Sequence, residues 1–275
     1  MTHRCAIAAL ALAATISLPS IANAQLAAHR AVYEIDLADA SERSGIKGMS
    51  GRMVYDFGGS SCDGYTTSFR FVTRIETEND SRLTDQQTTT FENVEDGVFQ
   101  FATRSFVDDS QDKDIEGVAN LDEGGIEVTL SSPEDLVVEL PETSFPTQHL
   151  IELLDVARDG ERFFERDLFD GSDDADEIMN TSAVIGEMRR HEDDANVDDK
   201  DGEALPIEFN GLRYWPVTIA YYSASEERGE ELPLYRIEMK LYENGVSRDL
   251  SMDYGEFQLS GTLSDIELRE ADRCD

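Results

Sequence analysis

The sequence is poor in basic residues, and this shortage excludes a class of function. Lysine and arginine together number 23 against 59 aspartates and glutamates, which gives a formal net charge of −36. A field of this sign repels DNA, RNA and anionic lipid headgroups, so we expect no electrostatic binding to nucleic acid. We interpret the acidic excess as an aid to solubility, with a basic partner or bound divalent cations as the functional alternative.

Sequence motifs of catalysis and metal binding are also missing. The chain has four histidines, and none of them forms the H-E-x-x-H spacing of a zinc site. It has no G-x-S-x-G nucleophile elbow and no phosphate-binding P-loop. The acidic stretch from Asp194 fails as a calcium loop, because Asp199 and Leu205 stand where glycine and glutamate are needed. We therefore expect no enzymatic activity, no cofactor and no metal site, and keep weak divalent binding and a peptidoglycan-acting enzyme as alternatives.

A hydrophobic run of the length that spans a bilayer is absent from the sequence. The short run AIAALALAATISL follows Arg4 and leads to SIANA, where Ala22 and Ala24 have the spacing of a signal-peptidase site. We predict cleavage between Ala24 and Gln25, and export of residues 25–275 without membrane insertion. An uncleaved membrane anchor is the alternative.

Cysteine is scarce, with three in the whole sequence. Cys5 lies in the predicted signal peptide, which leaves Cys62 and Cys274. An exported chain with two cysteines usually pairs them, so we predict a disulfide that closes nearly the whole chain into one ring. Two free thiols or an intermolecular bridge are the alternatives. A redox role is disfavoured, because neither cysteine belongs to a C-x-x-C motif.

Strict alternation of apolar and polar residues is the dominant pattern of the remaining chain. In the segment 32–37 it places Tyr33, Ile35 and Leu37 on one face. Such alternation, interrupted by turn pairs such as Asp96-Gly97, predicts half-buried antiparallel strands. The predicted strands are 32–37, 52–57, 65–75, 97–106, 125–130, 135–140, 162–171, 213–222 and the C-terminal run.

The pair Asn244-Gly245 predicts a two-residue type I′ hairpin loop, in which both positions need positive φ. In that register Ile237 faces Met252 on an apolar face. A slip of one residue would break the pairing on both faces, so the two faces support a single register. The other predicted pairs are Tyr235 with Tyr254, Met239 with Leu250, Arg236 with Asp253, and Lys240 with Asp249.

One helix is predicted between Thr147, its N-cap, and Gly160, its stop. Its first turn contains His149, which we expect to pack or lie at the surface rather than to catalyse. The apolar residues with helical spacing are Leu150, Ile151, Leu154 and Ala157. Three acidic segments are predicted to be mobile loops because they carry like charges and few apolar residues. They are 108–114, 170–177 and 191–203.

The segment 213–222 is rich in aromatic residues. Alternation places Trp215 and Tyr221 on one face, and Tyr214 and Tyr222 on the other. We interpret this strand as part of the core, with an apolar trough for a ligand or a peptide strand as the functional alternative.

Several long runs carry a family resemblance. They are LAAHRAVYEIDLA, SGRMVYDFGGSSCDGYTTSFRFVT, FPTQHL, FDGSD, RYWPVTIAYY and LYENGVSRDLSMDYGEFQLSGTLSDIELREADRC. With these runs, which extend over nearly all of 25–275, the chain resembles the cell-envelope integrity EipB family of alphaproteobacteria. The resemblance implies a periplasmic protein that maintains the envelope under stress and has no established enzymatic activity.

The resemblance also implies the fold. It would be a mainly β protein with one long, highly curved antiparallel sheet, open as a spiral or half-barrel around a packed α-helix, in a single domain over 25–275. It implies the Cys62–Cys274 disulfide and supplies no catalytic residues.

We therefore expect a non-enzymatic periplasmic protein that binds another periplasmic protein through exposed strand edges or a concave face. The alternative is a carrier of a lipophilic ligand. The two hypotheses differ in whether the face of Tyr235, Ile237 and Met239 leaves room against the helix.

Overall fold

The computed structural model describes residues 26–172, 174–191, 209–224, 232–270 and 274. The predicted cleavage site at Ala24 and Gln25 lies outside the described residues, and so does nearly all of the acidic segment 191–203.

Antiparallel strands form one sheet of 15 strands in the described part of the chain. The strands are β1 His29–Ala40, β2 Ile46–Ser60, β3 Gly64–Thr77, β4 Ser81–Asn93, β5 Val98–Val107, β6 Ser110–Asp122, β7 Gly125–Ser132, β8 Leu136–Leu140, β9 Phe163–Leu168, β10 Met179–Ile185, β11 Arg189–Arg190, β12 Arg213–Ser223, β13 Tyr235–Tyr242, β14 Ser247–Asp253 and β15 Phe257–Leu268. Helix α1 covers Pro146–Arg158. The mainly β fold with a packed helix is confirmed.

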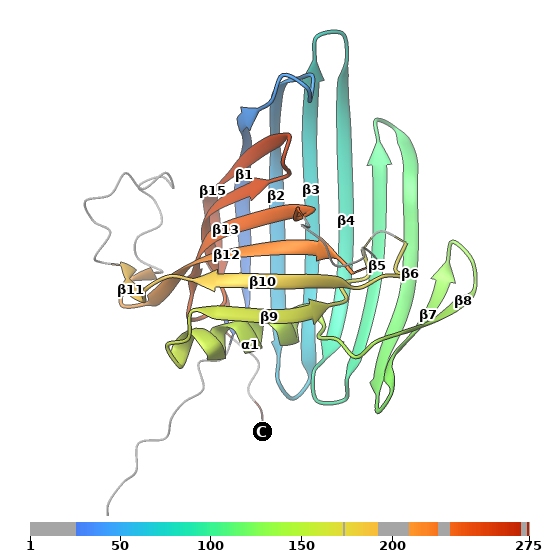
Figure 1. Ribbon diagram of the computed structural model, residues 1–275, viewed down its shortest axis with the longest axis vertical. Coiled ribbons are helices and arrows are strands. Elements are labelled where there is room, and N and C mark those ends of the chain that lie inside the picture. Colours follow the sequence, from blue (N-terminus) through green and yellow to red (C-terminus); the bar gives the residue numbers. More distant parts are fainter. Residues whose placement is uncertain (1–25, 173, 192–208, 225–231, 271–273, 275) are drawn as a thin grey trace, which may run out of the picture.

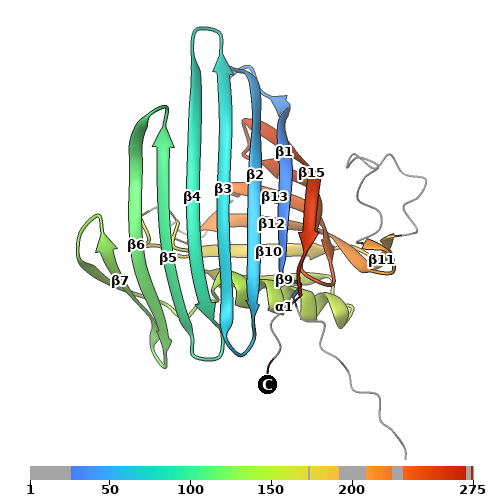
Figure 2. The ribbon, with the colours of Figure 1, turned by 180° about the vertical axis from the view of Figure 1, so that it is seen from behind.

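The sheet curls back over itself instead of lying flat. Its strand order is β8-β7-β6-β5-β4-β3-β2-β1-β15-β14-β13-β12-β10-β9, with β11 beside β12. The two halves of the chain join where β1 pairs with β15, and Figure 1 shows β9, β10, β12 and β13 crossing in front of the long strands β2 to β4. Figure 2 shows the same crossing from behind, with α1 at one end of the enclosed space. In the described chain β8 and β9 do not pair with each other, so the sheet stays open.

The concave face of the curled sheet holds most of the core, because alternate residues of each strand point inward. One cluster surrounds α1, where Leu153 and Leu154 meet Trp215 of β12 and Phe57 of β2. A second lies where β1, β14 and β15 meet, and a third covers β5 to β7. Helix α1 therefore joins the two halves of the sheet by packing between them.

Every segment predicted as a strand overlaps an observed strand, although 162–171 extends past the end of β9 at Leu168. The prediction is also incomplete. Strands β4, β6, β10 and β11 were not predicted. The prediction that 108–114 is a mobile loop is wrong for most of this segment, because β6 begins at Ser110. The described residues of 170–177 have no regular structure, yet the segment is not simply solvated, because Ala175 is buried among the residues of the third cluster.

The hairpin of β13 and β14 follows the predicted register only away from its turn. Ile237 pairs with Met252 as predicted, and Arg236 with Asp253, but a bulge after Glu238 shifts the pairing toward the turn by one residue. Gly245 has φ of 87°, whereas Asn244 does not have positive φ, so the loop is not type I′. The two predicted pairs beyond the bulge, Met239 with Leu250 and Lys240 with Asp249, are therefore not register partners. The ion pair Lys240–Asp249 forms nevertheless, at 2.6 Å.

Helix α1 starts differently from the prediction, which is wrong about Thr147 as N-cap. The N-cap is Phe145, which offers no side-chain hydrogen bond, and Pro146 is the first helical residue. The missing cap comes from Glu92 of β4, whose two carboxylate oxygens accept hydrogen bonds from the backbone N–H groups of Thr147 at 2.6 Å and Gln148 at 2.8 Å. A strand 55 residues earlier in sequence thus holds the start of the helix.

The C-terminal end of the sheet is fastened at three points. Cys62, in the turn between β2 and β3, forms a disulfide with Cys274, with 5.8 Å between their Cα atoms. The guanidinium of Arg269 donates two hydrogen bonds of 2.8 Å to the carboxylate of Asp56 on β2. The backbone N–H of Arg269 also bonds to the carbonyl oxygen of Ala28. Among the described residues no helix has the length and apolar composition of a membrane span.

Candidate ligand chamber

A cavity of about 360 Å³ lies between the concave face of the sheet and α1, and we call it the main cavity. Leu150 and Leu153 of α1 form one wall, and β13 forms the opposite wall with Tyr235, Ile237 and Met239. Its size falls in the range of small-molecule sites, about 300–1,000 Å³. The helix therefore does not fill the space against this face of β13. Its further lining residues are His29, Tyr33, Met53, Tyr55, Pro146, His149, Leu168, Asp170, Ile219, Tyr221, Leu241, Gly245, Ser247, Leu250 and Met252.

A second cavity of about 290 Å³ adjoins the first, and we call it the side cavity. The two cavities share four lining residues, Tyr55, Pro146, Leu150 and Asp170. The side cavity is more polar, because the inward-facing residues of β4 are threonine and glutamine. Its further lining residues are Phe57, Thr67, Phe69, Gln86, Thr88, Thr90, Thr103, Thr147 and Ser172. The pair of cavities thus joins an apolar compartment to one with hydroxyl and amide groups.

The two histidines of the main cavity are held by hydrogen bonds and kept uncharged by burial. His149 bonds through Nε2 to the hydroxyl of Thr181 at 2.8 Å, and that hydroxyl donates to the carbonyl oxygen of Arg166. Burial lowers the pKa of His149 to about 4. His29 bonds through Nδ1 to the carbonyl oxygen of Ala27 at 2.7 Å, and burial lowers its pKa as well. Both rings are therefore neutral at pH 7.

The tyrosines of the main cavity are also fixed in place. The rings of Tyr221 on β12 and Tyr235 on β13 stack with centroids 4.4 Å apart. The hydroxyl of Tyr33 donates to the carbonyl oxygen of Ser247 at 2.7 Å. Burial, and next the negative charge of Asp170, raises the pKa of Tyr221. These contacts give the cavity rigid walls, as expected for a preformed site.

Asp170 stands where the two cavities meet. Its carboxylate oxygen Oδ1 accepts a hydrogen bond of 2.8 Å from the backbone N–H of Ser172, which forms a tight turn in the FDGSD segment. The preceding Phe169 is 1% exposed and lies edge-on to the rings of Phe99 and Phe101. The aromatic cluster therefore anchors the backbone that presents the carboxylate.

The position of α1 over the cavities depends on Glu92. This carboxylate is 1% exposed, and burial raises its pKa, while the two backbone N–H groups of the helix favour its charged form. The N-terminus of a helix stabilises a negative charge, so the contact between this carboxylate and the start of α1 is electrostatically favourable. Farther along, Arg158 donates to the carbonyl oxygen of Glu243 at 2.8 Å. The helix is thus held at both ends.

A polar groove of about 720 Å³ lies at the open end of the sheet. It is lined by Glu165, Arg166 and Asp167 of β9, by residues of β10, and by the segment before α1. Arg166 forms an ion pair with Glu152 of α1 at 2.7 Å. The described residues contain no group of three or more histidine, cysteine or acidic side chains able to hold a metal ion.

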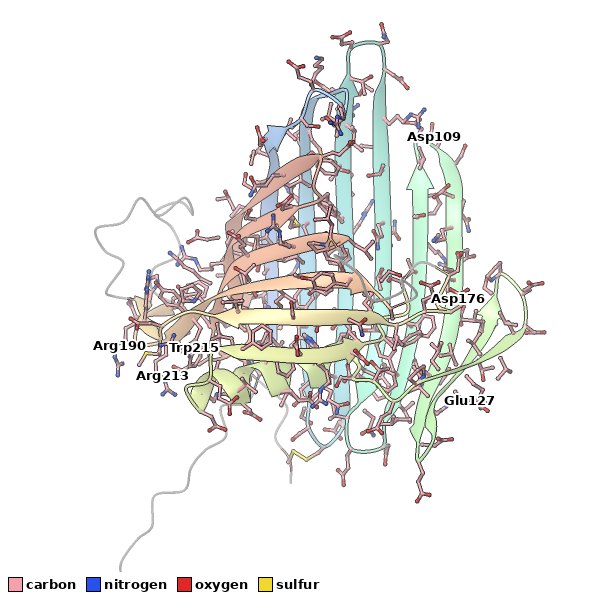
Figure 3. The ribbon with its side chains drawn as sticks, in the orientation of Figure 1. Asp109, Glu127, Asp176, Arg190, Arg213 and Trp215 are labelled. Carbon is pink, nitrogen blue, oxygen red and sulfur yellow. A yellow bond between two sulfur atoms is a disulfide. The ribbon has the colours of Figure 1, made fainter. Side chains whose placement is uncertain are left out.

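The sequence-predicted residues are only partly brought together in this region. His149 packs in the interior, as expected, and Trp215, Val217 and Ile219 belong to the cluster around α1. Cys62 and Cys274 are fastened to each other but line neither cavity. Figure 3 shows the disulfide as a yellow bond at the lower end of the long strands, and Trp215 at the side away from Glu127 and Asp176.

Sequence reasoning missed His29, Tyr55, Glu92 and Asp170. Asp170 carries a local signal, since an Asp-Gly pair followed by serine is a turn motif that fixes a carboxylate. Glu92 carries no such local signal, because its partner is the start of a helix that comes near it only in the folded chain. In an acidic chain one carboxylate cannot be distinguished from the others.

The fold and its two cavities define a class: an open, curled antiparallel sheet that wraps around helix α1 and leaves an apolar cavity between them. The EipB-like family profile matches residues 20–270, which is most of the chain. The protein therefore belongs to the EipB-like family, and the resemblance read from its sequence is confirmed.

Two relatives from Brucella abortus show how close the match is. The cell envelope integrity protein EipB of strain 2308 is 44% identical over 245 residues, which are 89% of this chain and 85% of that protein. A crystal structure described as a beta-barrel-like protein of a domain of unknown function, DUF1849, superposes with a TM-score of 0.82 at 42% identity. That match covers 90% of this chain and all of the other. The relationship supports a role in cell envelope integrity.

Proposed function

We propose that this protein supports the cell envelope from the periplasm as a non-enzymatic binding protein, and that its partner is another periplasmic protein. The observation that carries the proposal is the open sheet. Among the residues that the structure describes, strand β8 pairs only with β7, and it exposes Leu136 by 45% and Val137 by 57%. Strand β9, at the other end, is covered by the segment before α1, where Ser144 pairs with Leu168. An uncovered edge offers backbone hydrogen bonds to an incoming strand.

A matched pair of variants tests this proposal. Val137→Lys places a charge on the free edge, a substitution that discourages strand addition. Val184→Lys is the control, since Val184 is 58% exposed on β10, which has strands on both sides. Affinity capture from periplasmic extract, oxidised and reduced in parallel, should recover a partner with the wild type and Val184→Lys but not with Val137→Lys. Equal recovery by both variants would contradict binding at β8.

A second candidate function is the carriage of a lipophilic ligand, and the main cavity favours it. The space between α1 and the face of Tyr235, Ile237 and Met239 supports this alternative, because a fully packed interface would leave no room for an acyl chain. The cavity walls are mainly aliphatic and aromatic, which suits such a ligand.

Native mass spectrometry of the purified protein tests the carrier function. We expect a lipid adduct with the wild type, and its loss in Ile237→Trp, where the larger ring fills the main cavity. Val184→Trp, on the exposed face of β10, should keep the adduct. If the wild type shows no adduct even after incubation with a long-chain alcohol, the carrier function is wrong.

A further inference from the structure

Strand β4 carries a row of polar side chains on the concave face, where the rest of the sheet carries most of the apolar core. At one end of the row Glu92 caps α1, and toward the other end Thr84 bonds to the hydroxyl of Thr73 on β3. The middle of the row lines the side cavity with Gln86, Thr88 and Thr90. Polar groups in an interior cost free energy unless they find hydrogen-bond partners. The side cavity therefore needs a content that can pair with this part of the row.

The protein itself uses only part of the hydrogen-bonding capacity of these side chains. The hydroxyl groups of Thr88 and Thr103 on β5 share a hydrogen bond of 3.1 Å, which occupies one hydroxyl proton and leaves the other for a further acceptor. The side chains of Gln86 and Thr90 make no hydrogen bond to another residue in the part of the chain that the structure describes. The row therefore offers uncharged donors and acceptors to a ligand in the side cavity.

The polar row lies next to an apolar compartment. The main and side cavities share Tyr55, Pro146 and Leu150 in their lining, and the main cavity continues along the apolar side chains of Ile237 and Met239 on β13. A molecule that occupies both cavities would have its apolar part against β13 and its polar part against β4. No described lysine or arginine lines either cavity, so an anionic headgroup would find no basic side chain there. The pair of cavities thus suits an amphipathic molecule with an uncharged polar end.

We propose that the side cavity binds a small uncharged headgroup with several hydroxyl groups, such as the glycerol of a monoacylglycerol, while the acyl chain occupies the main cavity. This inference rests on the second proposed function, the carriage of a lipophilic ligand, and names the class of lipid. A hydroxyl group both donates and accepts, so neighbouring hydroxyls of the ligand can pair with the amide of Gln86 and the hydroxyls of Thr88 and Thr90. A plain hydrocarbon chain in the side cavity would instead leave these groups unpaired.

Three probes of equal chain length and different headgroups test the inference: 1-O-decylglycerol, decanol and decanoate, titrated calorimetrically below their micelle concentrations. We expect the wild type to bind decylglycerol at least about fivefold more tightly than decanol, as one further hydrogen bond between uncharged groups would give. Decanoate should bind most weakly, because its carboxylate must be desolvated without a basic side chain in the described lining.

The chain offers a matched control, because three successive threonines of β4 alternate in direction. In the double variant Thr88→Val/Thr90→Val, the inward hydroxyls become methyl groups of nearly the same size, and valine is favourable in a strand. This variant should still bind decanol but lose the preference for decylglycerol. Thr89→Val changes the exposed, outward threonine between them and should keep the preference.

The outcomes separate the inference from the carrier function on which it rests. Equal binding of decylglycerol and decanol by the wild type, or tightest binding of decanoate, would leave the carrier function intact and overturn the inference. A preference for decylglycerol that persists in Thr88→Val/Thr90→Val would mean that the headgroup binds elsewhere, and it would also overturn the inference. If none of the three probes binds the wild type, the carrier function fails and the inference fails with it. The wild-type ranking needs no variant, so a poorly folded double variant would not leave the question open.

Discussion

At the scale of single residues, buried polar groups fix the geometry of the chamber. Glu92 replaces a local N-cap by reaching from β4 to the first turn of α1. This arrangement couples the helix to the sheet, because the helix N-terminus loses its hydrogen-bond acceptors if the strand moves. His149, one turn into the helix, bonds to Thr181 of β10 and so connects α1 to the opposite half of the sheet.

Replacing Glu92 with glutamine should destabilise the protein. Glutamine offers one acceptor oxygen where the carboxylate offers two, so one of the N–H groups of Thr147 and Gln148 would lose its partner. We expect Glu92→Gln to lower the free energy of unfolding by about 1–3 kcal/mol, the usual cost of a buried unsatisfied group. Chemical denaturation measures this loss. Glu127→Gln, on an exposed position of β7, is the control and should change little, and an equal effect of the two would refute the role of Glu92.

The buried His149 should make stability depend on pH. Its pKa is about 4 in the folded protein and 6.5 without burial. A depressed folded pKa means that the stabilisation is complete above pH 6.5 and is lost as the pH falls toward 4, because only the unfolded chain takes up the proton. The difference in unfolding free energy between wild type and His149→Gln should therefore fall by about 3 kcal/mol between pH 7.5 and pH 4. A difference that stays constant over this range would contradict the assignment.

At the scale of secondary-structure elements, the conformation of a turn sets the strand register that the pattern of apolar and polar residues leaves undetermined. The loop between β13 and β14 has positive φ at Gly245 only, at 87°. The resulting shift is absorbed by a bulge near Asp249, which itself has φ of 52°. The predicted pairing of apolar residues is therefore kept in the part of the hairpin away from the turn, whereas the register next to the turn moves by one residue.

We expect Gly245→Ala to destabilise the hairpin. An L-residue at this φ costs about 1–2 kcal/mol, and the added Cβ would also lie 2.8 Å from a methyl carbon of Leu26. Gly124→Ala is a matched control in another β-turn, because Gly124 does not have positive φ and its Cβ would meet nothing closer than 3.4 Å. Thermal melting should therefore show a loss for Gly245→Ala that clearly exceeds the change for Gly124→Ala. Equal losses would show that the backbone conformation at Gly245 is not the cause.

Alternation predicted most of the strands that have one apolar face, and it missed β4, which has none. The inward residues of β4 include Gln86, Thr88 and Thr90, which line the side cavity, so both faces of this strand are polar. The start of β6 is acidic and reads as a loop for the same reason. The polar residues that line the side cavity therefore also interrupt the alternation by which the strand would have been predicted. The position of Asp170 beside the cavity follows from packing of Phe169, which local sequence does not encode.

At the scale of the whole molecule, the curl of the sheet could not be derived from strand patterns, and the family resemblance supplied it. Curvature accumulates from twist and from bulges, such as the register shifts of β1 against β15 after Val32 and Leu37. No single strand specifies where the sheet passes over itself. The two cavities result from this curl and from α1 together, so they could not be predicted from separate strands and helices either.

The disulfide constrains nearly the whole chain, and we expect it to stabilise the fold mainly by restricting the unfolded state. The end of β15 is already tied to β1 and β2 through Arg269, so loss of the bridge leaves those native contacts in place. Because Cys62 and Cys274 are 212 positions apart, the bridge restricts nearly the entire unfolded chain, and the chain-entropy estimate for such a loop is roughly 5 kcal/mol.

Under oxidising conditions, the double variant Cys62→Ser/Cys274→Ser should therefore melt about 10 °C or more below the wild type. Adding reductant should lower the wild type to the same melting temperature and leave the double variant unchanged, which controls for the serine substitutions themselves. A wild type and a double variant that melt together when oxidised would mean that the closed ring does not constrain the unfolded chain. Stability would then depend on the contacts of Arg269 and on the packing around α1.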